Sequence, residues 1–216
     1  MNLRTRMTRF AMIAGMFGAT TALSLPEAMA SAAPAAVGGV VAAPPSSSLG
    51  KLGPLTDLVI ERLLVSDDVA ASKFGTDSPI EDPAREQQVL DQVRRQAEDL
   101  GVDGDAAVAF FRDQITASKV VQKGLFARWT AHPEEAPTTR PDLAEIRRRL
   151  DRLTTELLDS LKSTEHIRKK AVACATQLTL ATASGAKRER LDALHRQALE
   201  TATDSVCNPA KPAGHN

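Results

Sequence analysis

Beyond residue 50, apolar residues recur every three or four positions, and no segment alternates apolar and polar residues as a half-buried strand does. Leu55, Val59, Leu63 and Val69, for example, share one face of a helix. The pattern therefore predicts an all-α fold. Six helices are expected, at about residues 54–76, 83–100, 103–130, 143–163, 166–183 and 187–207.

Residues that start and stop helices support these boundaries. Asp82 precedes Pro83, which is typical of an N-cap followed by the first helical position. Asp103 and Asp142 stand in the same way before the third and fourth helices, and Gly101 ends the second. Because three of the helices are long and the chain has one domain's length, we expect a single-domain six-helix bundle.

The first thirty residues have the features of a signal peptide. Arg4, Arg6 and Arg9 form a basic region, a short apolar stretch follows, and "AMA" at 28–30 is a small-x-small cleavage site. The alternative is an N-terminal membrane anchor. We expect the signal peptide over 1–30, with the mature protein starting near Ser31. The expected order is then a disordered Ala/Pro/Gly/Ser-rich leader at 31–50, a helical domain at 51–208 and a tail at 209–216.

The mature chain has two cysteines, Cys174 and Cys207. In an exported protein such a pair is typical of a disulfide, although two free buried thiols are the alternative. Both cysteines fall in predicted helices, so the bridge would tie a C-terminal helical hairpin. No spacing of cysteine and histidine indicates a metal site, and four single histidines are expected on the surface: His132, His166, His195 and His215.

Composition excludes some partners. Lys plus Arg number 27 and Asp plus Glu number 27, so the balance gives no indication of nucleic acid or an anionic membrane as partner. Aromatic residues make up only 3% of the chain and there is no Tyr, which removes the usual platform for stacking bases.

Polar residues interrupt the apolar faces of three helices. Arg62 and Lys73 are eleven residues, or about three turns, apart on the apolar stripe of the first helix. Ser118 and Gln122 interrupt the stripe of the third, and Arg147 flanks that of the fourth. Taken singly, such an arginine usually extends to water, and such a serine or glutamine is often a satisfied core group.

Taken together, the cations indicate a ligand. Arg62, Lys73, Arg85 and Arg147 come from three helices, and Glu86 and Asp82 balance only part of their charge. Because each unpaired buried charge costs several kcal/mol, the cluster predicts a ligand with about two negative charges. Arginine suits carboxylates in particular, since its planar fork binds them bidentately.

These residues carry a family resemblance. The order of Arg62, Lys73, "PIEDPAREQQVL", Ser118 with Gln122, and "LAEIRRRLDRLTTELL" resembles the all-helical chorismate mutases. The signal peptide, the additional C-terminal helices and the cysteine pair resemble the secreted (gamma) subclass. The resemblance covers about residues 52–207 and implies the rearrangement of chorismate to prephenate, without a cofactor.

The resemblance also implies roles. Arg62 and Arg147 would clamp the two substrate carboxylates, with Arg85 beside them and Ser118 assisting. Lys73 and Gln122 would donate to the ether oxygen, and Glu86, near Asp82, would accept from the ring hydroxyl. Some secreted relatives have Glu at the position of Gln122 and an apolar residue at that of Glu86. The dependence of activity on pH is therefore the property that the resemblance predicts least well.

A different kind of protein stays open at this point. An exported helical protein could bind a dicarboxylate without turning it over, although such a protein would not need Lys73 and Gln122. For either function we expect an exported protein, secreted or periplasmic, with no membrane association after cleavage. All site residues lie on one chain, and a homodimer remains open.

Overall fold

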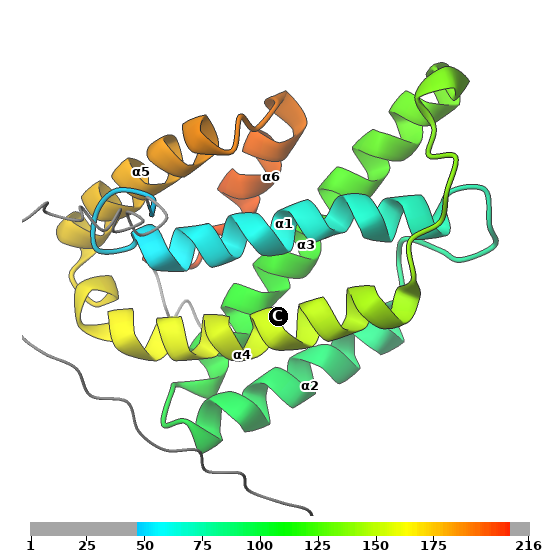
Figure 1. The fold of residues 1–216 in the computed structure, drawn as a ribbon. Helices are drawn as coiled ribbons and strands as arrows, with labels where there is room; N and C mark the ends of the chain where they lie inside the picture. Colours follow the sequence, from blue (N-terminus) through cyan, green and yellow to red (C-terminus); the bar gives the residue numbers. More distant parts are fainter. Residues whose placement is uncertain (1–46, 208–216) are drawn as a thin grey trace, which may run out of the picture. The chain divides into compact units, whose positions relative to one another are not determined.

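The computed structural model describes residues 47–207, which fold into helices (Figure 1). The helices are α1 (Gly53–Lys73), α2 (Pro83–Asp99), α3 (Gly104–Ala131), α4 (Leu143–Arg168), α5 (Ala171–Arg188) and α6 (Ala193–Ala202), with a short 3-10 helix η1 (Pro133–Glu135) after α3. Within these residues there is no strand, so the prediction of an all-α fold with six helices is confirmed. The expected signal peptide, most of the leader and the tail lie outside the described residues.

Three predicted N-caps are confirmed. The Asp82 side chain accepts a hydrogen bond from the backbone N–H of Arg85 at 3.0 Å. Asp103 caps α3 through Ala106 N at 3.0 Å, and the Asp142 side chain accepts from the first turn of α4 at 2.8 Å. Each carboxylate satisfies an N–H group that has no partner within its helix, which fixes where α2, α3 and α4 begin.

α1 holds the helices together. It packs against α3, α4, α5 and α6, while α2 packs mainly on α3 (Figure 1). The core at these contacts is apolar and includes Phe110 and Phe111 of α3 and Leu157 of α4, all at most 2% exposed. No helix among the described residues combines the length and apolar character needed to cross a bilayer.

The predicted boundaries of the last two helices are wrong. The sequence "SGA" was expected to end the fifth helix, but α5 continues through Gly185 to Arg188. A Cβ atom at Gly185 would lie 2.6 Å from Ile60 Cδ1, so this glycine allows close packing of α5 on α1. The sixth helix is also shorter than predicted, because Asp192 caps α6 through His195 N and the helix ends at Ala202.

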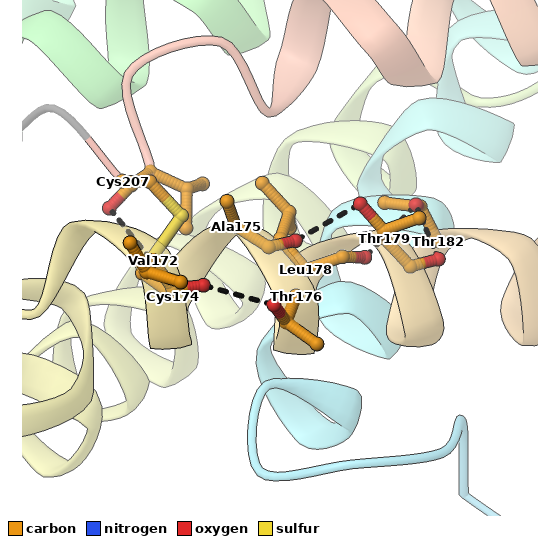
Figure 2. Close-up of a disulfide and its surroundings, with 9 residues drawn as sticks. Val172, Cys174, Ala175, Thr176, Leu178, Thr179, Thr182 and Cys207 are labelled. Atoms are coloured by element: carbon orange, nitrogen blue, oxygen red, sulfur yellow. Dashed lines mark hydrogen bonds between the residues drawn. A yellow bond between two sulfur atoms is a disulfide. The ribbon is translucent and has the colours of Figure 1, made fainter.

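The predicted disulfide is confirmed. Cys174, in the first turn of α5, is bonded to Cys207, with 5.5 Å between their Cα atoms (Figure 2). Cys207 was expected within the last helix but follows it, in the turns after Ala202. The bridge therefore ties the start of α5 to the segment leaving α6.

His195 was expected on the surface, and this prediction is wrong. The residue is only 7% exposed, and its ring lies between two carboxylates. One ring nitrogen is 2.7 Å from Asp192 Oδ1 and the other is 2.9 Å from Asp67 Oδ1 on α1. Hydrogen bonding to Asp67 raises the His195 pKa to about 9, against the effect of burial and with further help from Asp192. His195 therefore links α6 to α1. His132 and His166 are exposed as expected, and His215 lies outside the described residues.

Candidate active site

A cavity of about 480 Å³ lies between α1, α2, α3 and α4. All eight predicted site residues line it. They are Arg62 and Lys73 of α1, Asp82, Arg85 and Glu86 at the start of α2, Ser118 and Gln122 of α3, and Arg147 of α4. The structure thus brings together residues that are up to 85 positions apart in the sequence.

Arg62 lies against the wall of the cavity. Its Nη1 donates to the Leu150 carbonyl of α4 at 3.3 Å, and the guanidinium lies 5.6 Å from the Phe111 ring centroid. Burial lowers its pKa to about 10, although Asp151 favours the charged form. Arg62 is therefore still a cation at neutral pH, and its position is fixed by contacts with two other helices.

Lys73 ends α1 beside the turn that leads into α2. Its Nζ donates to the Pro79 carbonyl at 2.9 Å, which leaves two N–H bonds for other acceptors. Burial lowers the Lys73 pKa, while Asp82 and Glu86 oppose that effect. The turn therefore positions the ammonium group, and the two carboxylates favour its charged form.

Gln122 and Ser118 belong to a hydrogen-bonded chain across two helices. Gln122 Nε2 donates to Ser118 Oγ at 3.0 Å, and Ser66 Oγ of α1 donates to the same oxygen at 2.9 Å. Gln122 is only 4% exposed, and its Oε1 has no hydrogen-bond partner among the described residues. One N–H of Gln122 and the hydroxyl hydrogen of Ser118 remain available to a ligand.

Lys119 is a cation of the cavity that the sequence reasoning missed. Its Nζ lies 3.0 and 3.2 Å from the two carboxylate oxygens of Glu86 and 3.1 Å from Glu81. Burial disfavours its charge, but the hydrogen bonds that Lys119 donates to Glu86 and Glu81 outweigh this effect and raise its pKa. The available signal was its spacing of one turn from Ile115, which lines the same cavity.

Arg85 and Arg147 are the more exposed cations. Arg85 Nη1 donates to Gln88 at 3.3 Å, and Arg147 has no hydrogen bond or ion pair among the described residues. The lining contains five cations and three anions, which leaves a net formal charge of +2. The cations are Arg62, Lys73, Arg85, Lys119 and Arg147, and the anions are Asp82, Glu86 and Asp151. Such a cavity can bind a dianion.

In the part of the chain that the structure describes, no group of metal ligands lies in the cavity. Among residues 47–207, His132, Glu134 and Glu135 do come close enough together to hold an ion, but all three are exposed and lie outside the cavity. Glu135 is moreover an ion-pair partner of Arg128.

Comparison with known proteins gives a consistent assignment. Residues 54–123 match the protein family described as chorismate mutase type II. The secreted chorismate mutase of Mycobacterium tuberculosis is 36% identical over 163 residues, covering 76% of this chain and 81% of the relative. That of Mycolicibacterium smegmatis is 37% identical over 156 residues, covering 72% and 86%.

Solved structures agree. The crystal structure of chorismate mutase from Burkholderia thailandensis has a TM-score of 0.66 at 39% identity, covering 71% of this chain and 99% of that one. The enzyme from Burkholderia phymatum has a TM-score of 0.68 at 35% identity, covering 72% and 95%. The segment that matches the family model, residues 54–123, contains nearly all of α1, all of α2 and most of α3, and it includes seven of the eight predicted site residues. On fold, sequence and site together, this chain belongs to the chorismate mutase family.

Proposed function

We propose that the protein is a secreted chorismate mutase that converts chorismate to prephenate in the cavity between α1 and α4. The observation that carries the proposal is the net charge of +2 on a cavity lined by all eight predicted residues. Chorismate carries two carboxylates, so its charge of −2 balances the net charge of +2 on the lining. The related proteins named as secreted chorismate mutases support the same activity.

The reaction is an intramolecular [3,3] rearrangement, in which the ether C–O bond breaks as a new C–C bond forms. It needs no nucleophile, no proton transfer and no cofactor. The enzyme must hold the flexible enolpyruvyl arm over the ring, and a well-oriented intramolecular reaction gains much of its rate from such restraint. We assign Arg62 and Arg147, which line the cavity from α1 and α4, to the two carboxylates, with Arg85 beside them and Ser118 assisting.

Negative charge develops on the ether oxygen as the C–O bond breaks. Lys73 and Gln122 both have unused N–H groups, and we assign them to this oxygen. Donors that are already in place stabilise such a charge without reorganising during the reaction. Glu86 would accept from the ring hydroxyl, because a carboxylate that already binds Lys119 still has lone pairs available.

Export and assembly form part of the same proposal. The signal peptide predicted over residues 1–30 and the relatives named as secreted support a protein released from the cytoplasm. The disulfide fits an oxidising destination. Because one chain supplies all the lining residues, we propose that one protomer forms a complete site, even if the protein forms a homodimer.

Substitution of the arginines tests the assignment. Arg62→Ala and Arg147→Ala each remove a charge-assisted hydrogen bond, so we expect kcat/KM to fall roughly 10- to 100-fold with a raised KM. Arg148→Ala is the matched control for Arg147→Ala, because Arg148 is its neighbour on α4 but pairs with Glu145 outside the cavity. Wild-type rates in both cavity variants would place the site elsewhere. Tight chorismate binding without turnover by the wild type would instead indicate a binding protein.

A further inference from the structure

A second cavity, of about 210 Å³, lies between the start of α3 and the last turns of α4. It shares no lining residue with the larger cavity. Its apolar wall consists of Val102, Ala106 and Leu161. Its charged residues are Asp103, Lys162, Glu165, Arg168 and Lys169, three cations and two anions with a net formal charge of +1.

Arg168 is the unusual member of this lining, because it is a charged side chain that is only 5% exposed. Its Nη2 donates to the Leu161 carbonyl at 2.8 Å. Its Nε is buried and has no hydrogen-bond partner among the described residues. Burial lowers the Arg168 pKa, with Glu165 opposing that effect. The guanidinium is therefore largely desolvated while most of its donors remain unused.

The neighbouring acids do not form an ion pair with Arg168. The Glu165 carboxylate lies 2.6 Å from Lys169 Nζ. Asp103 uses its carboxylate to cap α3 through Ala106 N. The end of α4 favours a nearby cation, but that effect amounts to about half a charge. Because a buried charge without a partner is unfavourable, an anion that enters this cavity would gain a strong hydrogen-bonding partner in Arg168.

We propose that this second cavity binds a small organic monocarboxylate. Its carboxylate would accept hydrogen bonds from Arg168, and its apolar part would lie on Val102, Ala106 and Leu161. The size agrees with this class of ligand, because a dry cavity of about 150 Å³ already holds benzene. This site is separate from the active site and does not depend on the proposed reaction.

Benzoate is the probe, with neutral benzamide and inorganic phosphate as comparisons. Because benzoate would also meet the arginines of the larger cavity, the starting protein is Arg147→Ala. At ten times its Kd, benzoate should raise the Tm of this protein by about 3–5 °C. The shift should be absent in Arg147→Ala/Arg168→Met and retained in Arg147→Ala/Arg148→Met, since Arg148 lies outside both cavities. Benzamide and phosphate should give smaller shifts.

A second variant covers the case in which Arg168→Met does not fold. Ala106→Leu keeps Arg168 but fills the cavity, so it should also abolish the benzoate shift. Chorismate turnover by the single variant Arg168→Met should stay within about twofold of wild type, because distant sites act independently. Equal shifts with and without Arg168, or with benzoate and benzamide, would overturn the proposal. Absence of turnover in the wild type would count against the proposed reaction alone.

Discussion

Replacing Gln122 by glutamate should make catalysis depend on pH. Gln122 is 4% exposed, and its amide donates to Ser118 Oγ at 3.0 Å with a second N–H still available. The ether oxygen can only accept a hydrogen bond. An amide donates at any pH, whereas a carboxyl group donates only when protonated. No histidine lines the cavity among the described residues, so wild-type rates should vary little from about pH 5 to 8.

The structure gives the direction of the effect. A glutamate side chain starts from a pKa of about 4.3, which burial would raise and the surrounding cations would lower. Gln122→Glu should be active on the acid side of its new pKa and lose activity as pH rises through it. The ionised carboxylate would repel the developing charge and also accept the Ser118 hydroxyl hydrogen. Loss of one such donor costs about 3 kcal/mol, or roughly two orders of magnitude in rate.

The assay is kcat/KM against pH for wild type, Gln122→Glu and Gln122→Leu at matched ionic strength. The leucine variant is the control, because it lacks the donor at every pH and should be slow with a flat profile. If the Gln122→Glu profile runs parallel to that of wild type, Gln122 does not contact the ether oxygen. The assignment of α3 to that oxygen would then be withdrawn.

Three further predictions concern Lys119, His195 and Cys207, which are not among the residues assigned to the substrate. Lys119→Met should leave Glu86 without its ion-pair partner and lower kcat/KM about tenfold in steady-state assays, whereas Lys119→Arg should keep most of the wild-type kcat/KM. Equal values for wild type and both variants would show that Lys119 does not position Glu86. Because the pKa of His195 is raised from 6.5 to about 9, its contribution to stability is complete below about pH 6.5 and is lost as pH rises through 9. Urea unfolding should show this decline in wild type but not in His195→Gln. If the free energy of unfolding changes with pH equally in both proteins, the prediction is refuted. Cys207→Ser should lower the free energy of unfolding by about 3–4 kcal/mol in the same assay, and an unchanged midpoint would show that the bridge adds no stability.

The features that could be predicted from sequence were local or periodic. Asp82, Asp103 and Asp142 marked helix starts because a short acidic side chain satisfies free N–H groups next to it in the chain. Arg62 and Lys73 were predicted to face the cavity because a helix places residues eleven apart on the same side.

The features that could not be predicted depend on tertiary contacts. Gly185 resembled a helix terminator, but its role is set by Ile60 of a distant helix. His195 is buried because Asp67 reaches it from α1, 128 residues away in the chain. Lys119 lies one turn from Ile115 beside the predicted stripe of α3, and its contact with Glu86 of α2 fixes it in the cavity.

The most direct measurement follows the loss of chorismate's ultraviolet absorbance with purified wild type, Lys73→Ala and Lys187→Ala. Lys73 lines the cavity, whereas Lys187 is exposed on α5 and lines none of the cavities described. Wild type and Lys187→Ala should consume chorismate at the same rate. Lys73→Ala, with an unchanged circular dichroism spectrum, should lose on the order of a hundredfold or more in kcat. No absorbance loss with wild type, or an equal rate with Lys73→Ala, would contradict the account.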